Sequence, residues 1–193
     1  MTTAHVPLAT TRSATGIPTG RLALWWVLAS EVVIFGGLLA SYIMLRLQHP
    51  DWGDEASHTS TVAGALNTFV LLTSSLFAVL GHKAAVQGDG PRAARFLWMT
   101  VGGGAVFMLV KVFEYTSEIT HGFTLFRSVF WGFYFTATGL HGLHVLAGMA
   151  AIGLVAVAAR RGEHLHRVEL VGIYWHFVDV VWIFLFPLLY LAK

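Results

Sequence analysis

The sequence predicts an all-α integral membrane protein built as a bundle of five transmembrane helices. Of the 193 residues, 56% are hydrophobic and only 11% are Asp, Glu, Lys or Arg, whereas soluble domains carry about 25% charged residues. A soluble fold of this length could not cover so much apolar surface, because a domain of ~150–200 residues still exposes roughly a third of its chain. Cytosolic enzymes and nucleic-acid-binding proteins are therefore disfavoured, and the formal net charge of +2 gives no indication of a nucleic-acid partner.

Five long apolar runs supply the expected membrane-spanning elements. About 20 helical residues cross a hydrocarbon core of ~30 Å, and each run reaches about this length. Continuous apolar runs favour helices over a transmembrane barrel, whose strands alternate in segments of ~10 residues. We expect a polar N-terminal tail over 1–20 without a secretory signal, followed by a single domain over 21–193 with spans at 22–45, 62–80, 96–115, 129–159 and 170–192.

Each span is identified by the small number of charged residues within it. The first contains a single charged residue, Glu31, and is closed by Arg46. The second and fourth contain no charged residue, and the fourth is longer than one crossing needs, so we expect it to tilt or to begin in the interfacial region. The third carries Lys111 and Glu114 in its last turns, and Asp179 is the one charged residue of the fifth.

The basic loop residues predict the orientation of the chain, because cytoplasmic loops are enriched in Lys and Arg. Eight basic residues fall on the side of the N-terminus and three on the opposite side. We therefore expect the N-terminus in the cytoplasm and the C-terminus outside. The eight are Arg12, Arg21, Lys83, Arg92, Arg95, Arg160, Arg161 and Arg167, and the three are Arg46, Arg127 and Lys193.

Ionisable side chains inside a membrane cost about 2.5–3.5 kcal/mol each on insertion scales, so each requires a partner or a function. Lys111 and Glu114 are three residues apart on one helix face. We interpret them as an interfacial ion pair at the membrane boundary, with a contact to a partner subunit or a lipid headgroup as the alternative. Glu31 has no basic residue in its own span. We expect it to be protonated or to face a polar cavity, as a proton-active or lipid-related site or as a structural hydrogen bond.

The intramembrane histidines form a second polar group. His176 and Asp179 share a helix face, so the carboxyl group could orient the imidazole. We favour a contact between helices for this pair, with proton transfer or metal binding as alternatives. His141 and His144 share a face of the fourth span. A bis-histidine haem would require one of them to face His176, and a copper site would want three convergent imidazoles. We favour a packed polar cluster instead. The chain contains no Cys, which excludes thiolate ligands and covalent haem attachment through a Cys-x-x-Cys-His motif.

Several stretches, taken in order, resemble subunit III of the haem-copper terminal oxidases, the cytochrome c oxidase subunit III family. The segment in the last span is the most specific, and the resemblance covers roughly residues 20–193. This length matches the short, five-helix bacterial members. The matching segments are Tyr174-Trp175-His176-Phe177-Val178-Asp179-Val180-Val181-Trp182-Ile183-Phe184-Leu185-Phe186, Thr138-Gly139-Leu140-His141-Gly142-Leu143-His144-Val145, Ser30-Glu31, Leu66-Asn67-Thr68, Thr73-Ser74-Ser75 and Glu114-Tyr115.

The resemblance implies an accessory subunit that contains no haem, no copper and no catalytic residue. The haems and copper of such a proton-pumping oxidase belong to its partners, subunits I and II, which an optional small subunit IV accompanies. The implied roles are to stabilise the catalytic subunit, to hold phospholipid and to support sustained proton uptake. Glu31 matches the family's carboxylate at the lipid cleft. The implied location is the bacterial cytoplasmic membrane, as a multi-pass protein of the aerobic respiratory chain.

Other functions remain open at this point. A subunit III-like chain could instead serve a quinol oxidase or a nitric oxide reductase. A self-contained haem-b electron carrier would use His176 with His141 or His144 as axial ligands. A small proton-coupled carrier built on Glu31, His176 and Asp179 is the least favoured, because the sequence lacks the paired halves common in transporters.

Overall fold

The computed structural model describes residues 19–49 and 52–192, and the regular elements within these residues are all helical. Five of the helices are long and apolar enough to cross a membrane, which confirms the predicted fold class. The expected tail over 1–20 lies outside the described residues except for its last two, which begin the first helix. The elements are α1 (Thr19–Arg46), α2 (Trp52–Ser57), α3 (Thr61–Val86), α4 (Gly90–Thr120), α5 (Val129–Arg160), α6 (Arg167–Phe186) and the π-helical η2 (Pro187–Leu191).

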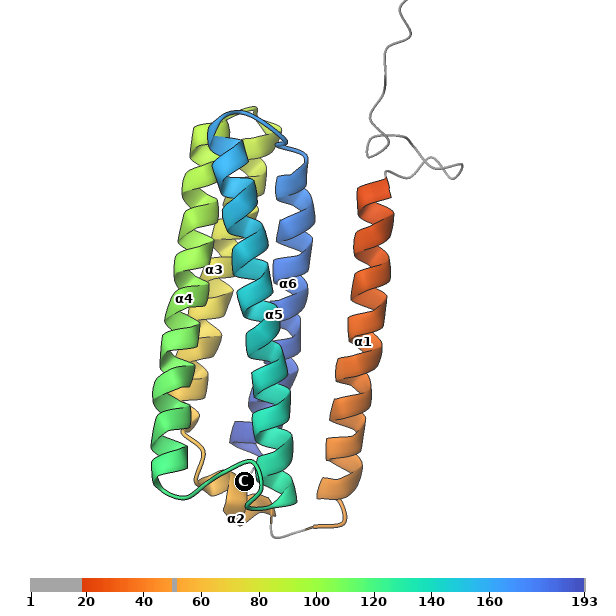
Figure 1. Ribbon diagram of the computed structural model, residues 1–193, viewed down its shortest axis with the longest axis vertical. Helices are drawn as coiled ribbons and strands as arrows, with labels where there is room; N and C mark the ends of the chain where they lie inside the picture. Colours follow the sequence, from red (N-terminus) through yellow and green to blue (C-terminus); the bar gives the residue numbers. More distant parts are fainter. Residues whose placement is uncertain (1–18, 50–51, 193) are drawn as a thin grey trace, which may run out of the picture.

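Four of the long helices form a closed bundle and the fifth stands beside it (Figure 1). Helix α3 packs on α4, α4 on α5, α5 on α6, and α6 returns to α3. Helix α1 contacts α6 and α5 and buries the smallest share of its residues among the five. We call the end of the bundle where α1, α4 and η2 finish the C-terminal end. The α3–α4 and α5–α6 connections lie at the opposite end (Figure 1).

Helices α3, α4 and α5 end in the same way, with a glycine in the left-handed region and a hydrogen bond that reaches back five residues. This arrangement satisfies carbonyl groups that would otherwise lack partners at the helix end. The glycines are Gly88 (φ +78°), Gly122 (φ +82°) and Gly162 (φ +75°). The bonds run from the N–H of Asp89 to Ala84 O (3.0 Å), of Phe123 to Glu118 O (2.9 Å) and of Glu163 to Ala158 O (3.1 Å).

These end structures explain why the helices are longer than the apolar runs. Helix α3 continues to Val86, past the expected end at 80, and α4 begins at Gly90, before the expected start at 96. The carboxylate of Asp89 accepts the N–H of Arg92 at 3.0 Å and so caps the start of α4. Pro91 lies in the first turn, where its missing N–H costs nothing.

A short helix, α2, lies in the connection between α1 and α3, where the apolar pattern predicts no helix. Its Trp52 is buried, with its ring 5.4 Å from that of Tyr42 and 6.0 Å from that of Phe130, centroid to centroid. The connection is therefore anchored to the C-terminal end of the bundle.

Close packing inside the bundle depends on glycine and serine residues that face the large side chain of Trp175. The fully buried Trp175 of α6 lies against Gly148 of α5 and Gly104 of α4. A Cβ at Gly148 would lie 2.9 Å from Trp175 Cε3, and a Cβ at Gly104 would lie 2.8 Å from Cη2. The indole N–H donates to Ser74 Oγ of α3 at 3.0 Å. One tryptophan thus contacts three helices, as small-residue packing in membranes permits.

Candidate functional site: intramembrane polar groups and the α1 cavity

The C-terminal end of the bundle contains a buried network centred on Lys111. Its Nζ donates to Glu114 Oε2 at 2.8 Å, to the Tyr190 hydroxyl at 2.8 Å and to the Tyr134 hydroxyl at 3.1 Å. Lys111 and Glu114 are only 4% and 6% exposed. The expected ion pair between Lys111 and Glu114 therefore forms, but it is buried inside the bundle and does not reach the membrane boundary. The cation is also held over aromatic faces, with Nζ 4.5 Å from the ring centroid of Tyr115.

The two tyrosines extend this network to a second carboxylate. The Tyr134 hydroxyl of α5 donates to Glu118 Oε1 at 2.7 Å, and the Tyr190 hydroxyl of η2 donates to Glu114 Oε2 at 3.1 Å. Glu118 follows Glu114 by one helical turn and is 5% exposed. The network therefore joins the charged side chains of α4 to α5 and η2 through two tyrosine hydroxyls.

The two cations of α1, Arg21 and Arg46, contact Glu169 and Ala192 O at the ends of the helix, and the partner of Glu31 comes from α5. Its Oε2 lies 3.0 Å from Nε2 of His144, with the geometry of an ion pair and not of an aligned hydrogen bond. Nδ1 of His144 lies 2.8 Å from the carbonyl oxygen of Leu140, so Nδ1 carries a hydrogen. Nε2 is then the ring nitrogen that faces the carboxyl group of Glu31.

His176 and Asp179 of α6 face α3. Nδ1 of His176 lies 2.5 Å from Ser75 Oγ. The Asp179 carboxyl interacts with the same serine but has no aligned hydrogen bond. Both side chains therefore reach the same serine of α3, and His176 forms a contact between α6 and α3.

His141 and His144 are three residues apart but have different neighbours. His141 is fully buried, with its ring 5.4 Å from Phe107 and 5.2 Å from Trp182, and neither ring nitrogen has a hydrogen-bond partner among the described residues. The other two intramembrane histidines contact Glu31 and Ser75. Within residues 19–49 and 52–192, no group of three or more His, Asp or Glu side chains could hold a metal ion.

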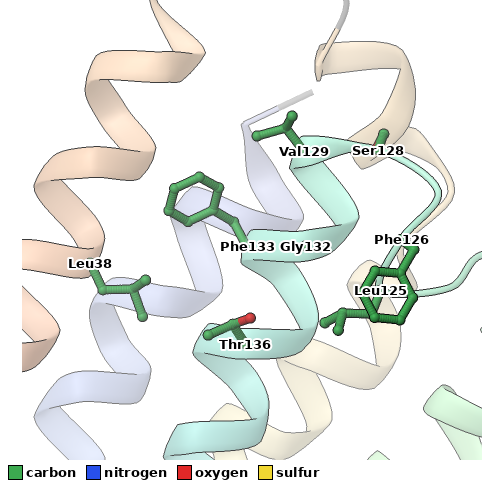
Figure 2. A pocket seen from close by; sticks show the side chains of 8 residues that line it. All are labelled: Leu38, Leu125, Phe126, Ser128, Val129, Gly132, Phe133 and Thr136. Atoms are coloured by element: carbon green, nitrogen blue, oxygen red, sulfur yellow. The ribbon is translucent and has the colours of Figure 1, made fainter.

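A cavity of about 610 Å³ lies between α1 and α5 at the C-terminal end. Figure 2 shows Leu38 of α1 on one side, Leu125 and Phe126 of the α4–α5 connection on the other, and Phe133 and Thr136 of α5 between them. Most of the lining is apolar. The cavity is thus suited to a hydrocarbon chain and unsuited to an ion.

Helix α1 is held to the bundle by polar contacts along its length, beside the packing of Phe35 and Tyr42 into the core. Arg21 Nη2 lies 2.6 and 2.7 Å from the two carboxylate oxygens of Glu169 at the opposite end. At the C-terminal end, the Tyr42 hydroxyl donates to Leu188 O at 2.9 Å, and the Arg46 guanidinium donates to Ala192 O. With the Glu31–His144 pair between them, these contacts fix α1 at both ends and in the middle.

Sequence reasoning singled out the charged members of these groups and missed their uncharged partners. Tyr134 and Tyr190 complete the Lys111 network, yet an isolated tyrosine in an apolar span gives no signal of its contact. Ser75 was quoted only as part of a motif, without a contact to His176. One feature of the sequence does indicate the extent of the network: Glu114 and Glu118 are four residues apart, which places a second carboxylate on the same face of α4.

Fold and polar groups together define a multi-pass α-helical membrane protein with several ionisable side chains buried among its helices. The family model for cytochrome c oxidase subunit III matches residues 10–192. The chain belongs to this family, which confirms the resemblance seen in the sequence, and it is accordingly part of a cytochrome c oxidase complex.

Curated relatives agree with this assignment. The cytochrome c oxidase subunit 3 of Thermostichus vulcanus is 38% identical over 175 residues, which cover 88% of this chain and 86% of the relative. That of Corynebacterium diphtheriae is 34% identical over 173 residues, covering 86% and 84%. That of Synechocystis is 34% identical over 172 residues, covering 85% and 72%.

Proposed function

We propose that this chain is a non-redox accessory subunit of a proton-pumping cytochrome c oxidase in a bacterial cytoplasmic membrane. It stabilises the catalytic subunit I, contacts subunit II, and leaves the haems and copper to these partners. The observation that carries the proposal is the family match over residues 10–192. The separate surroundings of His141, His144 and His176 also support it, because a bis-histidine haem needs two imidazoles that face each other.

The proposal includes a phospholipid chain in the cavity between α1 and α5. Space inside a membrane that side chains leave open must be filled by apolar groups, since water finds few partners there. The cavity lining is mostly apolar, and α1 contacts the bundle only lightly. A lipid acyl chain is the abundant apolar molecule that reaches such a place from the bilayer.

The Glu31–His144 pair supports a role in sustained proton uptake. A carboxyl group and an imidazole that lie 3.0 Å apart can exchange one proton between them, and the total charge of the pair is the same before and after the exchange. In the membrane such an exchange avoids the cost of an isolated charge. We assign Glu31 to the lipid-related and proton-related role that the family resemblance implies.

The test is native purification of the complex through a tag on this chain, with mass spectrometry of proteins and lipids and a haem extract. Subunits I and II, haem and copper are expected to co-purify, together with tightly held phospholipid. A stoichiometric Soret band or bound copper in this chain alone would contradict the proposal and favour the haem-b carrier. Absence of a subunit with a binuclear copper centre would favour a quinol oxidase or a nitric oxide reductase.

A pair of glycine variants tests the lipid part. Gly132 lines the cavity, so Gly132→Leu fills part of it and is expected to lower the number of retained phospholipids per complex. Gly36→Leu is the matched control, because Gly36 is exposed on α1 and a Cβ there meets nothing within 4 Å. Equal lipid content in both variants and the wild type would argue against lipid in this cavity.

A further inference from the structure

A second cavity, of about 330 Å³, opens at the C-terminal end between α3 and α4. Its mouth is formed by exposed residues, among them His58, Ser60 and Ser117, and its buried floor by Glu114 and Glu118. It is distinct from the apolar cavity beside α1, because two carboxylates and two hydroxyls line it.

Counting the hydrogens of the Lys111 network shows that its donors are used up. The ammonium group donates its three hydrogens to Glu114, Tyr134 and Tyr190, and each tyrosine donates its single hydrogen to a carboxylate. The hydroxyls of Tyr134 and Tyr190 lie 3.0 Å apart but have no further hydrogen to place between them. Glu114 Oε1 and Glu118 Oε2 are therefore left without a partner in the described part of the chain, and both are buried.

The charges of the network do not balance either. With Glu114 and Glu118 both ionised, one ammonium group faces two carboxylates, which leaves one excess negative charge on side chains that are about 95% buried. An uncompensated buried charge is strongly unfavourable. The other ionisable groups at this end have contacts of their own. His58, at the mouth of the cavity, has its ring 4.8 Å from that of Phe123. Arg127 donates to Gly122 O and lies over the Phe123 ring, and Glu55 accepts the indole N–H of Trp131.

We propose that this cavity binds one hydrated alkali-metal cation, with Glu114 Oε1 and Glu118 Oε2 as its charged ligands. A single positive charge balances the network, whereas a divalent ion would reverse its sign. Carboxylate, hydroxyl and water oxygens suit a hard cation, and Ser117 Oγ and Ser60 Oγ line the same cavity. The volume leaves room for retained water. This site is independent of the accessory role proposed above.

The experiment measures Na⁺ bound to the purified oxidase complex by equilibrium dialysis with radioactive sodium, in choline chloride of constant ionic strength. Glu118→Gln removes the excess charge and is expected to lower the bound Na⁺ by one per complex. Cations bound to other subunits cancel in this difference. Thermal stability follows the same pattern, with the wild type more stable in NaCl than in choline chloride and the variant equally stable in both.

Two further variants keep the test interpretable. Asp54→Asn removes one exposed negative charge from α2 at the same end without touching the cavity, and it is expected to bind Na⁺ like the wild type. Ser117→Ala keeps the charge and removes one oxygen, and it is expected to weaken Na⁺ binding about twofold to tenfold. The serine variant serves as the test if Glu118→Gln prevents assembly.

Three results would overturn the proposal. The first is equal Na⁺ binding by the wild type, Glu118→Gln and Ser117→Ala. The second is a wild type whose stability ignores Na⁺ but rises as the pH falls, which would mean that a proton balances the network. The third is Ca²⁺ binding that depends on Glu118 and that excess Na⁺ and K⁺ do not displace.

Discussion

Lys111 is the ionisable residue with the most buried hydrogen bonds among those described above, one to Glu114 of its own helix and two to tyrosines of other elements. All three of its ammonium hydrogens are donated to buried acceptors, and its charge lies between two carboxylates. A buried cation of this kind is not stabilising by itself, because its desolvation offsets most of its attraction. Removal of Lys111 is costly because Glu114 and Glu118 then remain buried without a cation.

We expect Lys111→Met to destabilise the protein by about 3–5 kcal/mol, since it leaves Glu114 and Glu118 buried without a cation. The measurement is thermal unfolding of the purified complex, together with the amount of this chain retained in it. Adding Glu114→Gln to Lys111→Met should restore part of the loss. A single variant as stable as the wild type would show that the network contributes nothing to stability.

Glu31 is expected to behave differently, because its partner His144 lies at the lightly packed boundary between α1 and α5. We predict that Glu31→Ala leaves assembly of the oxidase largely intact and lowers lipid retention or activity over many turnovers. Lipid analysis and the time course of oxygen consumption measure these effects. Glu31→Gln keeps the side-chain volume and separates the loss of the carboxyl group from the loss of packing. Complete absence of subunit I from the purified complex would instead indicate an assembly role.

At the scale of helices, α1 is the element that depends most on individual polar contacts. Helix association in a membrane lacks a hydrophobic driving force and relies on packing and hydrogen bonds. Helix α1 packs lightly, so Arg21, Glu31, Tyr42 and Arg46 account for much of its attachment to α5 and α6. These contacts differ in strength because they differ in exposure.

Arg46→Ala should loosen α1 more than Arg21→Ala. Arg46 is partly buried and bonds both Tyr42 and a backbone carbonyl, whereas the Arg21 side chain is 49% exposed and exposed pairs contribute about 0–1 kcal/mol. Hydrogen exchange of the purified complex measures the effect. Peptides over 40–49 should exchange faster in Arg46→Ala, and peptides over 19–26 should change little in Arg21→Ala. Equal protection of 40–49 in the wild type and Arg46→Ala would refute the assignment.

The five spans could be predicted because their signal is local, being the length of an uninterrupted apolar run. The direction in which Lys111 points could not be predicted, because it depends on the rotation of α4 and on Tyr134 and Tyr190, which come from other helices. Trp52 of α2 was missed for a related reason. Six residues are too few for a periodic pattern, and the burial of Trp52 depends on Tyr42 and Phe130.

For the whole molecule, the main asymmetry is between a closed bundle of four helices and a fifth helix beside it (Figure 1). The bundle contains the aromatic core and the Lys111 network, and both cavities open at its C-terminal end. Glu31 and His144 meet where α1 approaches the bundle. The orientation of the chain in the membrane therefore decides which aqueous side reaches the Glu114–Glu118 cavity.

The basic loop residues predict that this end faces outward. Among the described residues, Arg21, Lys83, Arg92, Arg95, Arg160, Arg161 and Arg167 lie toward the opposite end, against Arg46 and Arg127 at the C-terminal end. Fusions to the C-terminus test the prediction in cells. Alkaline phosphatase fused there should be active and green fluorescent protein dark, because each folds on one side only. Fusions in the α3–α4 connection near Gly88 should give the reverse pattern. A fluorescent C-terminal fusion would place the carboxylate cavity in contact with the cytoplasm, and the cation would then be drawn from the K⁺-rich side of the membrane.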